Sequence, residues 1–551
     1  MNTSLHTDKI NIQRLVKALY ILGCEYVVIS PGSRSAPIVQ EFYSYTSFQK
    51  TVIFDERSAG FYALGIAQQT KKPTILLCTS GTALLNYAPA ICEAFYQKIS
   101  LIILSADRPL ELRGKGENQT INQENIFNNF IKSSFNIDSL ENISDVVMKT
   151  IEEPKGPVHL NIPLTEPLYN TTSYEMPNEK LIGNITSSKS LSKTEKEVIK
   201  LKWKEKNRKV IICGRSDFQL SKLKYLLELT NLSDTLILSE PIANTTDNRI
   251  IQNTDGFCKM IADDKNFDPD LVVTIGEQIL SKQLRKVLKT KTNCEHWHLS
   301  LSYENWDIFG LLSNVISMTD VDFLKLISKS QKKQSNWQAL WLSKSQVLQQ
   351  ITENHESNTW SDFSIFRWLS NQIPDNSIIQ WGNSSVIRYA SIFKYNKNIK
   401  HFANRGTSGI DGCLSTAVGC ATANSDKVVY AVVGDLSFFY DSNALFIKPF
   451  PKNLRIILIN NAGGNIFRLI NGQKDEEILS EYFEARHQFD ASHFAKMFDL
   501  DYELVDDFQK LSQISSFILE TDPKPYILEL KTEPTENYSV YHSYFKKLNH
   551  E

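Results

Sequence analysis

Short apolar runs alternate with helical patterns over the first 170 residues of the chain. Aliphatic and β-branched residues dominate five of these runs, at 26–30, 51–55, 74–78, 100–105 and 156–162. Between the runs, apolar residues recur at helical spacing, as in the stretch from about residue 83 to residue 97. Continuous apolar strands that alternate with helices are typical of a parallel sheet covered on both faces. The pattern therefore predicts a first α/β block.

The same pattern returns twice after breaks in composition. A stretch rich in Ser, Thr, Asn, Lys and Glu, from Asn170 to about Lys206, predicts a linker. A second block follows to about residue 325, with strands predicted at 209–214, 235–238 and 271–275. After a helical, Gln-rich stretch, a third block has strands predicted at 377–380, 427–433, 454–459 and 525–530. We expect an α/β fold of three doubly wound parallel-sheet domains, at residues 1–175, 190–345 and 355–551.

Length and charge agree with several domains and a small-molecule role. At 551 residues the chain is too long for a single hydrophobic core. The 60 Lys and Arg residues nearly balance the 62 Asp and Glu residues, which gives a net charge of −2. This balance excludes nucleic acid or an anionic membrane surface as the main partner, but it allows a local basic pocket.

The chain carries no sign of export or of membrane insertion. The uncharged run from Pro73 to Cys92 has the length of a span of ~20 residues, but it contains a Thr79-Ser-Gly-Thr82 turn. We therefore predict a strand, a turn and a helix there. The 8 cysteines are scattered with no CxxC spacing, which indicates reduced thiols and a cytoplasmic location.

Polar and glycine-rich sequences follow the predicted strands. In open parallel sheets, ligands bind in the loops at the carboxyl ends of the strands. The candidate loops are 30–34, 55–57, 79–82, 106–109, 434–437 and 460–464. The binding residues are therefore expected in these loops.

Two of these loops carry hard oxygen ligands. Asp435 follows one buried strand and Asn461 follows the next, so neighbouring strands would bring the two side chains together. Carboxylate and amide oxygens suit Mg²⁺ held jointly with a diphosphate. Ordinary strand-to-helix turns are the alternative interpretation of each loop, but the spacing favours a ligand site. Glu56, where a strand meets a helix, is either a first-turn residue interacting with the helix dipole or a carboxylate bonded to a heterocycle nitrogen.

Together these sequences resemble the thiamine diphosphate-dependent enzymes of the pyruvate decarboxylase and acetolactate synthase type. The resemblance is closest to the branch of that family that serves menaquinone biosynthesis. The matching motifs are Ser30-Pro-Gly-Ser-Arg-Ser-Ala-Pro37, Phe54-Asp-Glu-Arg-Ser-Ala-Gly60, Thr79-Ser-Gly-Thr-Ala83, Ser105-Ala-Asp-Arg-Pro109, Gly382-Asn-Ser384, Asn404-Arg-Gly-Thr-Ser-Gly-Ile-Asp-Gly412 and Gly434-Asp-Leu-Ser437. The resemblance implies a transferase whose three domains are pyrimidine-binding (1–175), central (190–345) and diphosphate- and magnesium-binding (355–551).

The resemblance also implies cofactor contacts. Glu56 would bond the aminopyrimidine ring of thiamine diphosphate, and Ile410 would support the bent cofactor. Mg²⁺ or Mn²⁺ would be bound by Asp435, Asn461 and the Gly463 carbonyl. The other implied cofactor contacts are Gly434, Leu436, Ser437, Ile466 and Phe467. Family members place Glu56 and Asp435 of different subunits together, which implies a homodimer or a homotetramer with the active site at the subunit interface.

The branch decarboxylates 2-oxoglutarate and adds the resulting succinyl carbanion equivalent to isochorismate by conjugate addition. Both substrates are polyanions, and the planar guanidinium of arginine suits carboxylates. The implied substrate contacts are Ser33, Arg34, Arg108, Asn118, Gln119, Lys282, Ser384, Arg388 and Arg405. Of these, Gln119, Ser384, Arg388 and Arg405, with Glu56, would be catalytic. Some relatives have Arg after the Lys282 position, where this chain has Gln283.

The sequence also allows two alternative functions and suggests one metal site. Another thiamine diphosphate carboligase or decarboxylase that acts on pyruvate would need fewer pocket arginines. A non-catalytic member would not need Glu56, Asp435 and Asn461 together. Cys294, His296 and His298 alternate and would share one face of a strand, but they lack a fourth ligand, so a zinc site is not expected.

Overall fold

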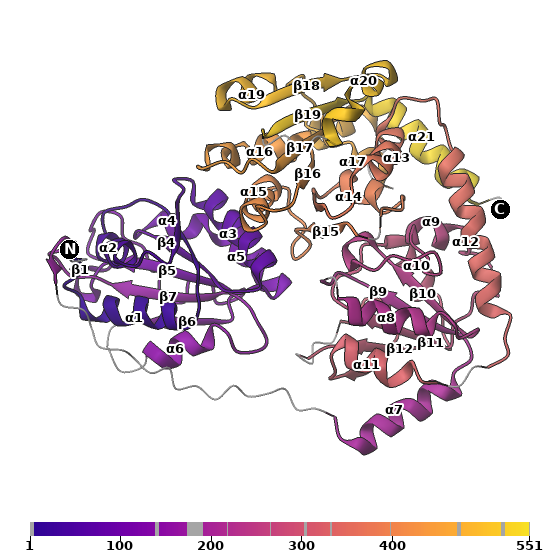
Figure 1. Cartoon of the computed structure of the whole chain (residues 1–551), viewed down its shortest axis with the longest axis horizontal. Helices are drawn as coiled ribbons and strands as arrows, with labels where there is room; N and C mark the ends of the chain where they lie inside the picture. Colours follow the sequence, from indigo (N-terminus) through magenta and orange to yellow (C-terminus); the bar gives the residue numbers. More distant parts are fainter. Residues whose placement is uncertain are drawn as a thin grey trace.

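The computed structural model describes residues 5–137, 143–173, 191–217, 219–264, 266–301, 306–330, 333–396, 398–470, 475–519 and 524–549. Three parallel sheets, each covered by helices, form three blocks (Figure 1). Their strand orders are β3-β2-β4-β5-β7-β6, β10-β9-β11-β12-β13 and β15-β14-β16-β17-β19-β18. The predicted α/β class with three doubly wound parallel sheets is confirmed.

The first block follows the predicted pattern with two shifts. Its strands are β2 (Tyr26–Ile29), β3 (Gln49–Val52), β4 (Thr74–Cys78), β5 (Leu101–Asp107), β6 (Ser133–Asn136) and β7 (Val158–Pro163), and β1 (His6–Thr7) pairs with β8 (Thr171–Thr172). Its helices are α1 (Ile10–Ile21), α2 (Ala36–Ser44), α3 (Glu56–Thr70), α4 (Thr82–Asn86), α5 (Ala88–Gln97) and α6 (Ile143–Lys149), with a short turn at Leu110–Leu112. The strand predicted at 51–55 ends earlier because Asp55 is the N-cap of α3. The single helix predicted at 83–97 is two helices, since Pro89 begins a new one.

The second block confirms the three predicted strands and adds two. The strands are β9 (Lys209–Cys213), β10 (Thr235–Ser239), β11 (Leu271–Ile275), β12 (Glu295–Leu299) and β13 (Leu312–Ile316). The helices are α7 (Lys193–Glu205), α8 (Leu220–Leu229), α9 (Thr254–Met260), α10 (Lys282–Lys289), α11 (Asp320–Ile327) and α12 (Trp337–Asn354), with a short turn at Pro241–Ala243. Helix α7 corrects part of the predicted linker: a capping box between Ser192 and Glu195 starts it, and it buries Trp203. Residues 174–190 of that linker lie outside the described residues.

The third block holds the four predicted strands and two short ones that the pattern did not indicate. The strands are β14 (Ile378–Trp381), β15 (Lys400–Ala403), β16 (Val429–Gly434), β17 (Leu454–Asn460), β18 (Asp501–Val505) and β19 (Tyr526–Lys531). The helices are α13 (Asp362–Gln372), α14 (Ser385–Ala390), α15 (Cys413–Ala423), α16 (Asp435–Tyr440), α17 (Ile466–Leu469), α18 (Glu476–Ile478), α19 (Ser492–Phe498), α20 (Phe508–Leu519) and α21 (Pro534–Lys547), with short turns at Ser442–Phe446 and Leu479–Phe483. Strands β15 and β18 lie at the two edges of the sheet, where polar residues are tolerated.

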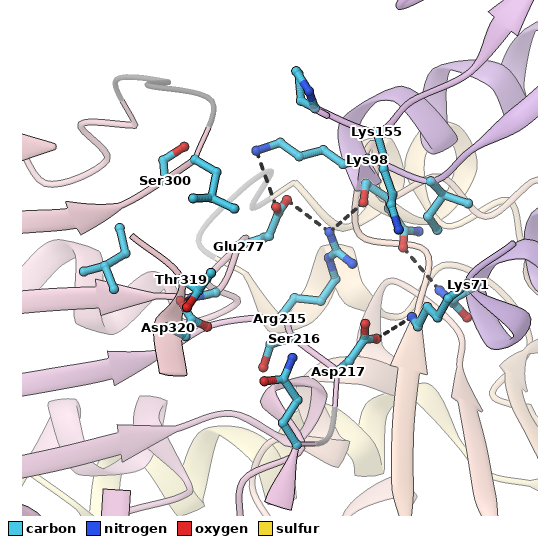
Figure 2. A pocket seen from close by; sticks show the side chains of 18 of the residues that line it. Lys71, Lys98, Lys155, Arg215, Ser216, Asp217, Glu277, Ser300, Thr319 and Asp320 are labelled. Atoms are coloured by element: carbon cyan, nitrogen blue, oxygen red, sulfur yellow. Dashed lines mark hydrogen bonds and ion pairs between the residues drawn. The ribbon is translucent and has the colours of Figure 1, made fainter. Parts of the chain in front are cut away.

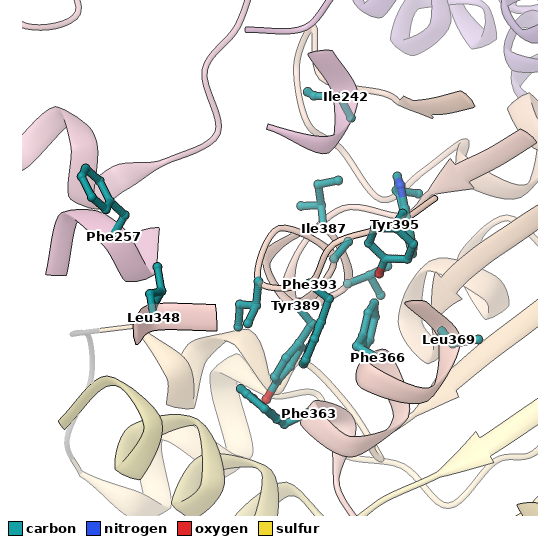
Figure 3. Close-up of a cluster of buried hydrophobic side chains, with 14 of the residues drawn as sticks. Ile242, Phe257, Leu348, Phe363, Phe366, Leu369, Ile387, Tyr389, Phe393 and Tyr395 are labelled. Atoms are coloured by element: carbon teal, nitrogen blue, oxygen red, sulfur yellow. The ribbon is translucent and has the colours of Figure 1, made fainter. Parts of the chain in front are cut away.

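Apolar packing joins the third block to both of the others. Helix α15 packs on α3 of the first block, and the backbones come so close that Gly419 lies against the carbonyl of Tyr62. A second apolar cluster runs from Phe257 and Leu348 of the second block to Phe363 and Ile387 of the third (Figure 3). Because α14 carries Ile387, this cluster also fixes the helix that carries Arg388.

The junction between the first and second blocks is polar instead (Figure 2). Lys71 Nζ lies 2.6 Å from Asp217 Oδ1, and Lys98 Nζ lies 3.5 Å from Glu277 Oε1. Arg215 donates a hydrogen bond of 3.1 Å to the carbonyl of Gln97. These residues line a cavity of about 750 Å³. It lies apart from the strand-end loops singled out in the sequence.

No described helix is long and apolar enough to cross a bilayer. Residues 73–92 fold instead as β4, a turn, α4 and the start of α5, so the predicted strand and turn are confirmed while the predicted helix is divided in two. All 8 cysteines are free thiols.

Candidate active site

Glu56 stands at the carboxyl edge of the first sheet, as the first residue of α3. Asp55 accepts hydrogen bonds from the N–H groups of Arg57 and Ser58, and this cap fixes the direction in which the helix begins. The half-buried Glu56 carboxylate accepts one side-chain hydrogen bond, of 3.4 Å from Asn86 Nδ2. It keeps free lone pairs for a ligand, because a carboxylate accepts several hydrogen bonds.

Glycines bring the predicted loops of this edge together. A Cβ on Gly32 would lie 2.2 Å from Thr79 Cβ, so only glycine lets the loop after β2 approach the loop after β4. Gly81, with φ +92°, lies against the backbone of Gln119 in the same way. Ser33, Asn118 and Gln119 are exposed at this edge.

The two predicted substrate-binding arginines of the first block, Arg34 and Arg108, already have protein partners. Arg34 is 5% exposed and donates to the carbonyl of Leu164 at 3.1 Å and to Glu166 Oε1 at 3.2 Å. Arg108 is half-buried and donates a hydrogen bond of 3.1 Å to the carbonyl of Asn118. Arg108 therefore holds the loop that carries Asn118 and Gln119 against the end of β5.

Asp435 lies at the carboxyl edge of the third sheet and is 2% exposed. Strands β16 and β17 are neighbours in register, so the predicted approach of Asp435 and Asn461 is confirmed. Asp435 Oδ2 accepts hydrogen bonds from the N–H groups of Asn461 at 3.1 Å and Gly463 at 2.9 Å. Asp435 Oδ1 accepts one of 2.6 Å from the N–H of Leu436. These backbone donors hold the carboxylate in one orientation.

Asn461 is oriented by a residue that the sequence did not indicate. Its Nδ2 donates a hydrogen bond of 2.8 Å to Asp362 Oδ2, at the start of α13. With the amide nitrogen turned toward Asp362, the amide oxygen is left for another ligand. Burial raises the pKa of the Asp362 carboxyl to about 6, and the nearby negative charge of Asp435 adds to the rise. Asp362 is 99 positions from Asn461, so no local motif could reveal the pair.

The residues around Asp435 fit a magnesium diphosphate. The Asp435 carboxylate, the Asn461 amide and the Gly463 carbonyl are the hard oxygen ligands that Mg²⁺ prefers. Asn465 is 2% exposed, and neither its Nδ2 nor its Oδ1 has a hydrogen-bond partner among the described residues. Buried polar atoms of this kind are normally paired, so a polar ligand fits here. His487, which the sequence also did not single out, places Nε2 at 3.4 Å from Asp435 Oδ2.

The remaining predicted cofactor residues lie beside this edge. Ser437 Oγ donates a hydrogen bond of 2.8 Å to the carbonyl of Ile410. Ile466 and Phe467 are half-buried at the start of α17, and the Phe467 ring packs edge-on against Phe483. Gly434 and Leu436 flank Asp435 at the end of β16 and the start of α16.

The predicted cations of the second and third blocks converge on one cavity of about 300 Å³, which we call the Arg388–Arg405 cavity. Its walls are formed by Glu240, Pro241, Thr254, Asp255, Leu280, Ser281, Lys282, Ser384, Ile387, Arg388, Ser391, Arg405 and Ser408. Arg388 lowers the pKa of Lys282, and burial lowers the pKa of Arg405. Three positively charged side chains so close together repel one another, and a bound anion would stabilise them.

The Arg388–Arg405 cavity is connected to the loop that carries Ile410. Arg405 Nη1 donates a hydrogen bond of 2.8 Å to Asn383 Oδ1. Asn383 Nδ2 in turn donates to the carbonyl of Gly409 at 2.6 Å. The next residue, Ser384, has φ +69°, which is a strained backbone conformation for a residue other than glycine. Ser384 is the N-cap of α14, so this conformation turns the chain into that helix.

The two sheet edges approach each other without direct contact between their acidic residues. Asn443 donates a hydrogen bond of 2.7 Å to Asp55, and Arg57 donates one of 2.7 Å to the carbonyl of Tyr440. Within the described residues, no hydrogen bond or ion pair joins Glu56 to Asp435.

The histidines of β12 are structural. Thr274 Oγ1 lies 2.9 Å from His296 Nε2 and 2.8 Å from His298 Nδ1. Burial lowers the pKa of His296 to about 4, so it is neutral at physiological pH. No group of three or more His, Cys, Asp or Glu side chains able to hold a metal occurs among the residues that the structure describes.

Comparisons with known proteins show the family of this chain. Residues 12–126 match the family model described as the thiamine pyrophosphate enzyme, N-terminal TPP binding domain. A 2-succinyl-5-enolpyruvyl-6-hydroxy-3-cyclohexene-1-carboxylate synthase of Flavobacterium psychrophilum is 38% identical, over 97% of this chain and 98% of the relative. Synthases of the same name from Flavobacterium johnsoniae, 38% identical over 97% and 98%, and Christiangramia forsetii, 36% identical over 98% and 99%, are also similar. The chain belongs to the 2-succinyl-5-enolpyruvyl-6-hydroxy-3-cyclohexene-1-carboxylate synthase family of thiamine diphosphate-dependent enzymes.

Proposed function

We propose that this chain is a thiamine diphosphate-dependent transferase of menaquinone biosynthesis. It decarboxylates 2-oxoglutarate and adds the succinyl fragment to isochorismate, which yields 2-succinyl-5-enolpyruvyl-6-hydroxy-3-cyclohexene-1-carboxylate and CO₂. The observation that carries the proposal is the convergence of Lys282, Arg388 and Arg405 on one cavity beside the loop of Ile410. Such a cavity suits a substrate with two carboxylates and is unnecessary for pyruvate.

When bound, thiamine diphosphate would supply a nucleophilic carbon that adds to the keto group and a cationic thiazolium ring that accepts the electron pair left behind by CO₂. Glu56 would bond its aminopyrimidine nitrogen and move a proton there, and Ile410 would support the bound cofactor. Asp435, Asn461 and the Gly463 carbonyl would bind Mg²⁺ or Mn²⁺. Gly434, Leu436, Ser437, Ile466 and Phe467 are assigned to the remaining contacts.

The substrate residues divide between the two sheet edges. Arg388, Arg405, Lys282 and Ser384 bind the carboxylates from the second and third blocks. From the first block, Ser33, Arg34, Arg108, Asn118 and Gln119 complete the pocket. Because Arg108 already donates a hydrogen bond to the carbonyl of Asn118, we expect it to act partly by positioning the 118–119 loop. Arg34 is held instead by Leu164 and Glu166. Gln119, Ser384, Arg388 and Arg405 are assigned with Glu56 to catalysis.

We infer that the three blocks are pyrimidine-binding (1–175), central (190–345) and diphosphate- and metal-binding (355–551) domains. The family resemblance supports a homodimer or homotetramer with the active site at the subunit interface. Phe54 and Phe489, 58% and 67% exposed, add apolar surface for such an assembly. The free thiols support a cytoplasmic location.

Mass spectrometry of the products from 2-oxoglutarate and isochorismate tests the proposal. The purified protein with thiamine diphosphate and Mg²⁺ should release CO₂ from 2-oxoglutarate and form the succinylated product. Preference for pyruvate would replace the substrate assignment. A protein whose melting temperature does not respond to thiamine diphosphate plus Mg²⁺ would instead be a non-catalytic member.

A further inference from the structure

A buried carboxylate, Glu240, lies in the wall of the Arg388–Arg405 cavity and has no role in the function proposed above. It follows the last residue of β10 and is 4% exposed. Cationic side chains explain why an anionic substrate would enter this cavity. A carboxylate in the same wall opposes that binding, so its presence needs a reason.

One reason is that Glu240 holds the start of α10. Its Oε2 accepts a hydrogen bond of 2.6 Å from the N–H of Leu280, and its Oε1 accepts one of 2.7 Å from the N–H of Ser281. Ser281 is the N-cap of α10, and Lys282 is the first residue of that helix. The negative charge also suits the helix N-terminus. Glu240 thereby sets where Lys282 stands relative to Arg388.

Charged and titratable groups from several elements surround Glu240. The charged and titratable groups that act on it or share its surroundings are Asp255 and Cys258 on α9, Cys213 on β9, Lys282 and Arg285 on α10, Arg388 on α14 and Arg405 after β15. Burial is the largest influence and raises the pKa of Glu240 to about 7, although its two backbone hydrogen bonds and Arg405 oppose the rise. Asp255 raises it further, and burial keeps the two thiols neutral.

A bound dianion changes this balance in one direction. It brings negative charge against Glu240 and displaces water that solvates the carboxylate, and both effects favour the neutral acid. Its negative charge also offsets the stabilisation that Arg405 gives to the ionised Glu240 carboxylate. A protonated Glu240 still offers lone pairs to the two N–H donors, so α10 keeps its anchor.

We propose that Glu240 takes up a proton from solvent when a carboxylate-bearing substrate binds in the Arg388–Arg405 cavity. The inference rests on the proposed function, since that function supplies the dianion. Glu240 is then a positioning residue: ionised in the free enzyme, where it orients Lys282 and offsets the cations, and neutral in the complex, where it no longer repels the substrate.

Calorimetry of the holoenzyme with isochorismate, in the absence of 2-oxoglutarate, measures this proton directly. Titrations at pH 8 in two buffers that differ in ionisation enthalpy should show uptake of about one proton per bound molecule, since the free group is mostly ionised there. The dissociation constant should rise about tenfold per pH unit above neutrality, because one proton accompanies binding. The KM for isochorismate should follow the same trend while kcat changes less.

Variants separate proton uptake from a purely structural role. Glu240→Gln should bind without proton uptake and with a flat pH profile, whereas Glu240→Asp should bind less tightly but restore the uptake. Asp255→Asn is the matched control: it removes the other carboxylate of the cavity and should keep the uptake. If the role of Glu240 were purely structural, Glu240→Gln would bind isochorismate more weakly by the same factor at every pH and would keep the proton uptake. That result overturns the inference.

The same experiment distinguishes failure of the inference from failure of the proposed function. An enzyme that forms the product without proton uptake keeps its function and refutes the role of Glu240. If isochorismate does not bind, glutarate is titrated as a simple dicarboxylate. Uptake with glutarate that disappears in Glu240→Gln supports the inference while the substrate assignment fails. Absence of binding by either anion overturns both.

Discussion

The crossing of α3 and α15 gives a prediction whose size follows from measured distances. At Gly419, a Cβ would lie 2.0 Å from the carbonyl oxygen of Tyr62 and 3.2 Å from the nitrogen of Ile66. Ordinary contact begins near 3.4 Å, so alanine would push the helices apart by about 1.4 Å. Overpacking of this kind costs ~1–3 kcal/mol. The better helix propensity of alanine returns ~1 kcal/mol, so Gly419→Ala should destabilise the protein by up to ~2 kcal/mol.

Turnover should fall together with stability, because α3 begins at Glu56 and α15 follows the loop of Ile410. Urea unfolding and product formation at saturating cofactor are the measurements. Gly65→Ala, whose Cβ would lie 2.1 Å from the carbonyl of Thr416 at the same crossing, should behave alike. The double variant should lose less than the sum, since helices already separated accept the second methyl more easily.

Gly256→Ala is the control for the substitution itself. It lies in α9 of the second block, away from the crossing of α3 and α15, and the three atoms nearest to the added methyl, at 2.6 to 2.9 Å, belong to the capping side chain of Asn253. It should therefore retain turnover. If Gly419→Ala matched the natural protein in both stability and turnover, the close packing of α3 on α15 would not be what holds the first block to the third.

Further predictions concern single side chains. Glu56→Gln should keep the urea midpoint but lower turnover by ~10²-fold or more, and near-normal turnover would contradict its role. Asp435→Ala should weaken cofactor binding through the metal, measured as the Mg²⁺ dependence of the melting temperature; an unchanged dependence would exclude it as a ligand. Asp362→Asn should weaken Mg²⁺ binding by ~10–100-fold by releasing the amide of Asn461. His401, buried and with its pKa lowered to about 3, contributes stability above pH ~6.5 that is lost as the pH falls, by ~2 kcal/mol at pH 5. Between pH 7 and pH 5, the free energy of unfolding of His401→Gln, measured with urea, should fall by ~2 kcal/mol less than that of the unsubstituted protein. An equal fall in both proteins would refute this role of His401.

The candidate loops could be predicted from the sequence because local patterns mark them. All of them except 55–57 follow a buried apolar strand, and Gly32 and Gly81 stand where another loop approaches closely. Helix α7 was misread as linker because its composition is polar around a single buried tryptophan. The edge strands β15 and β18 were missed because edge strands need no continuous apolar run.

The supporting residues were not accessible from sequence. Asp362 orients Asn461, 99 positions away in the chain, and Glu240 anchors α10 through backbone N–H groups. A single carboxylate or amide between ordinary neighbours has no periodicity to detect. Only the folded backbone defines what such a side chain can reach.

The sequence alone determined the α/β class and the three blocks, because these depend on hydrophobic periodicity and local turn chemistry. The family resemblance added the residues proposed to bind a diphosphate, a metal and carboxylates. The tertiary structure decided which of the predicted cations share a cavity. Lys282 meets Arg388 and Arg405 there, while Arg34 is held by Leu164 and Glu166. It also decided that Glu240 belongs with them. Proximity between distant segments arises from the packing of whole helices and sheets, and the chemistry of a site depends on distance and burial rather than on position in the chain.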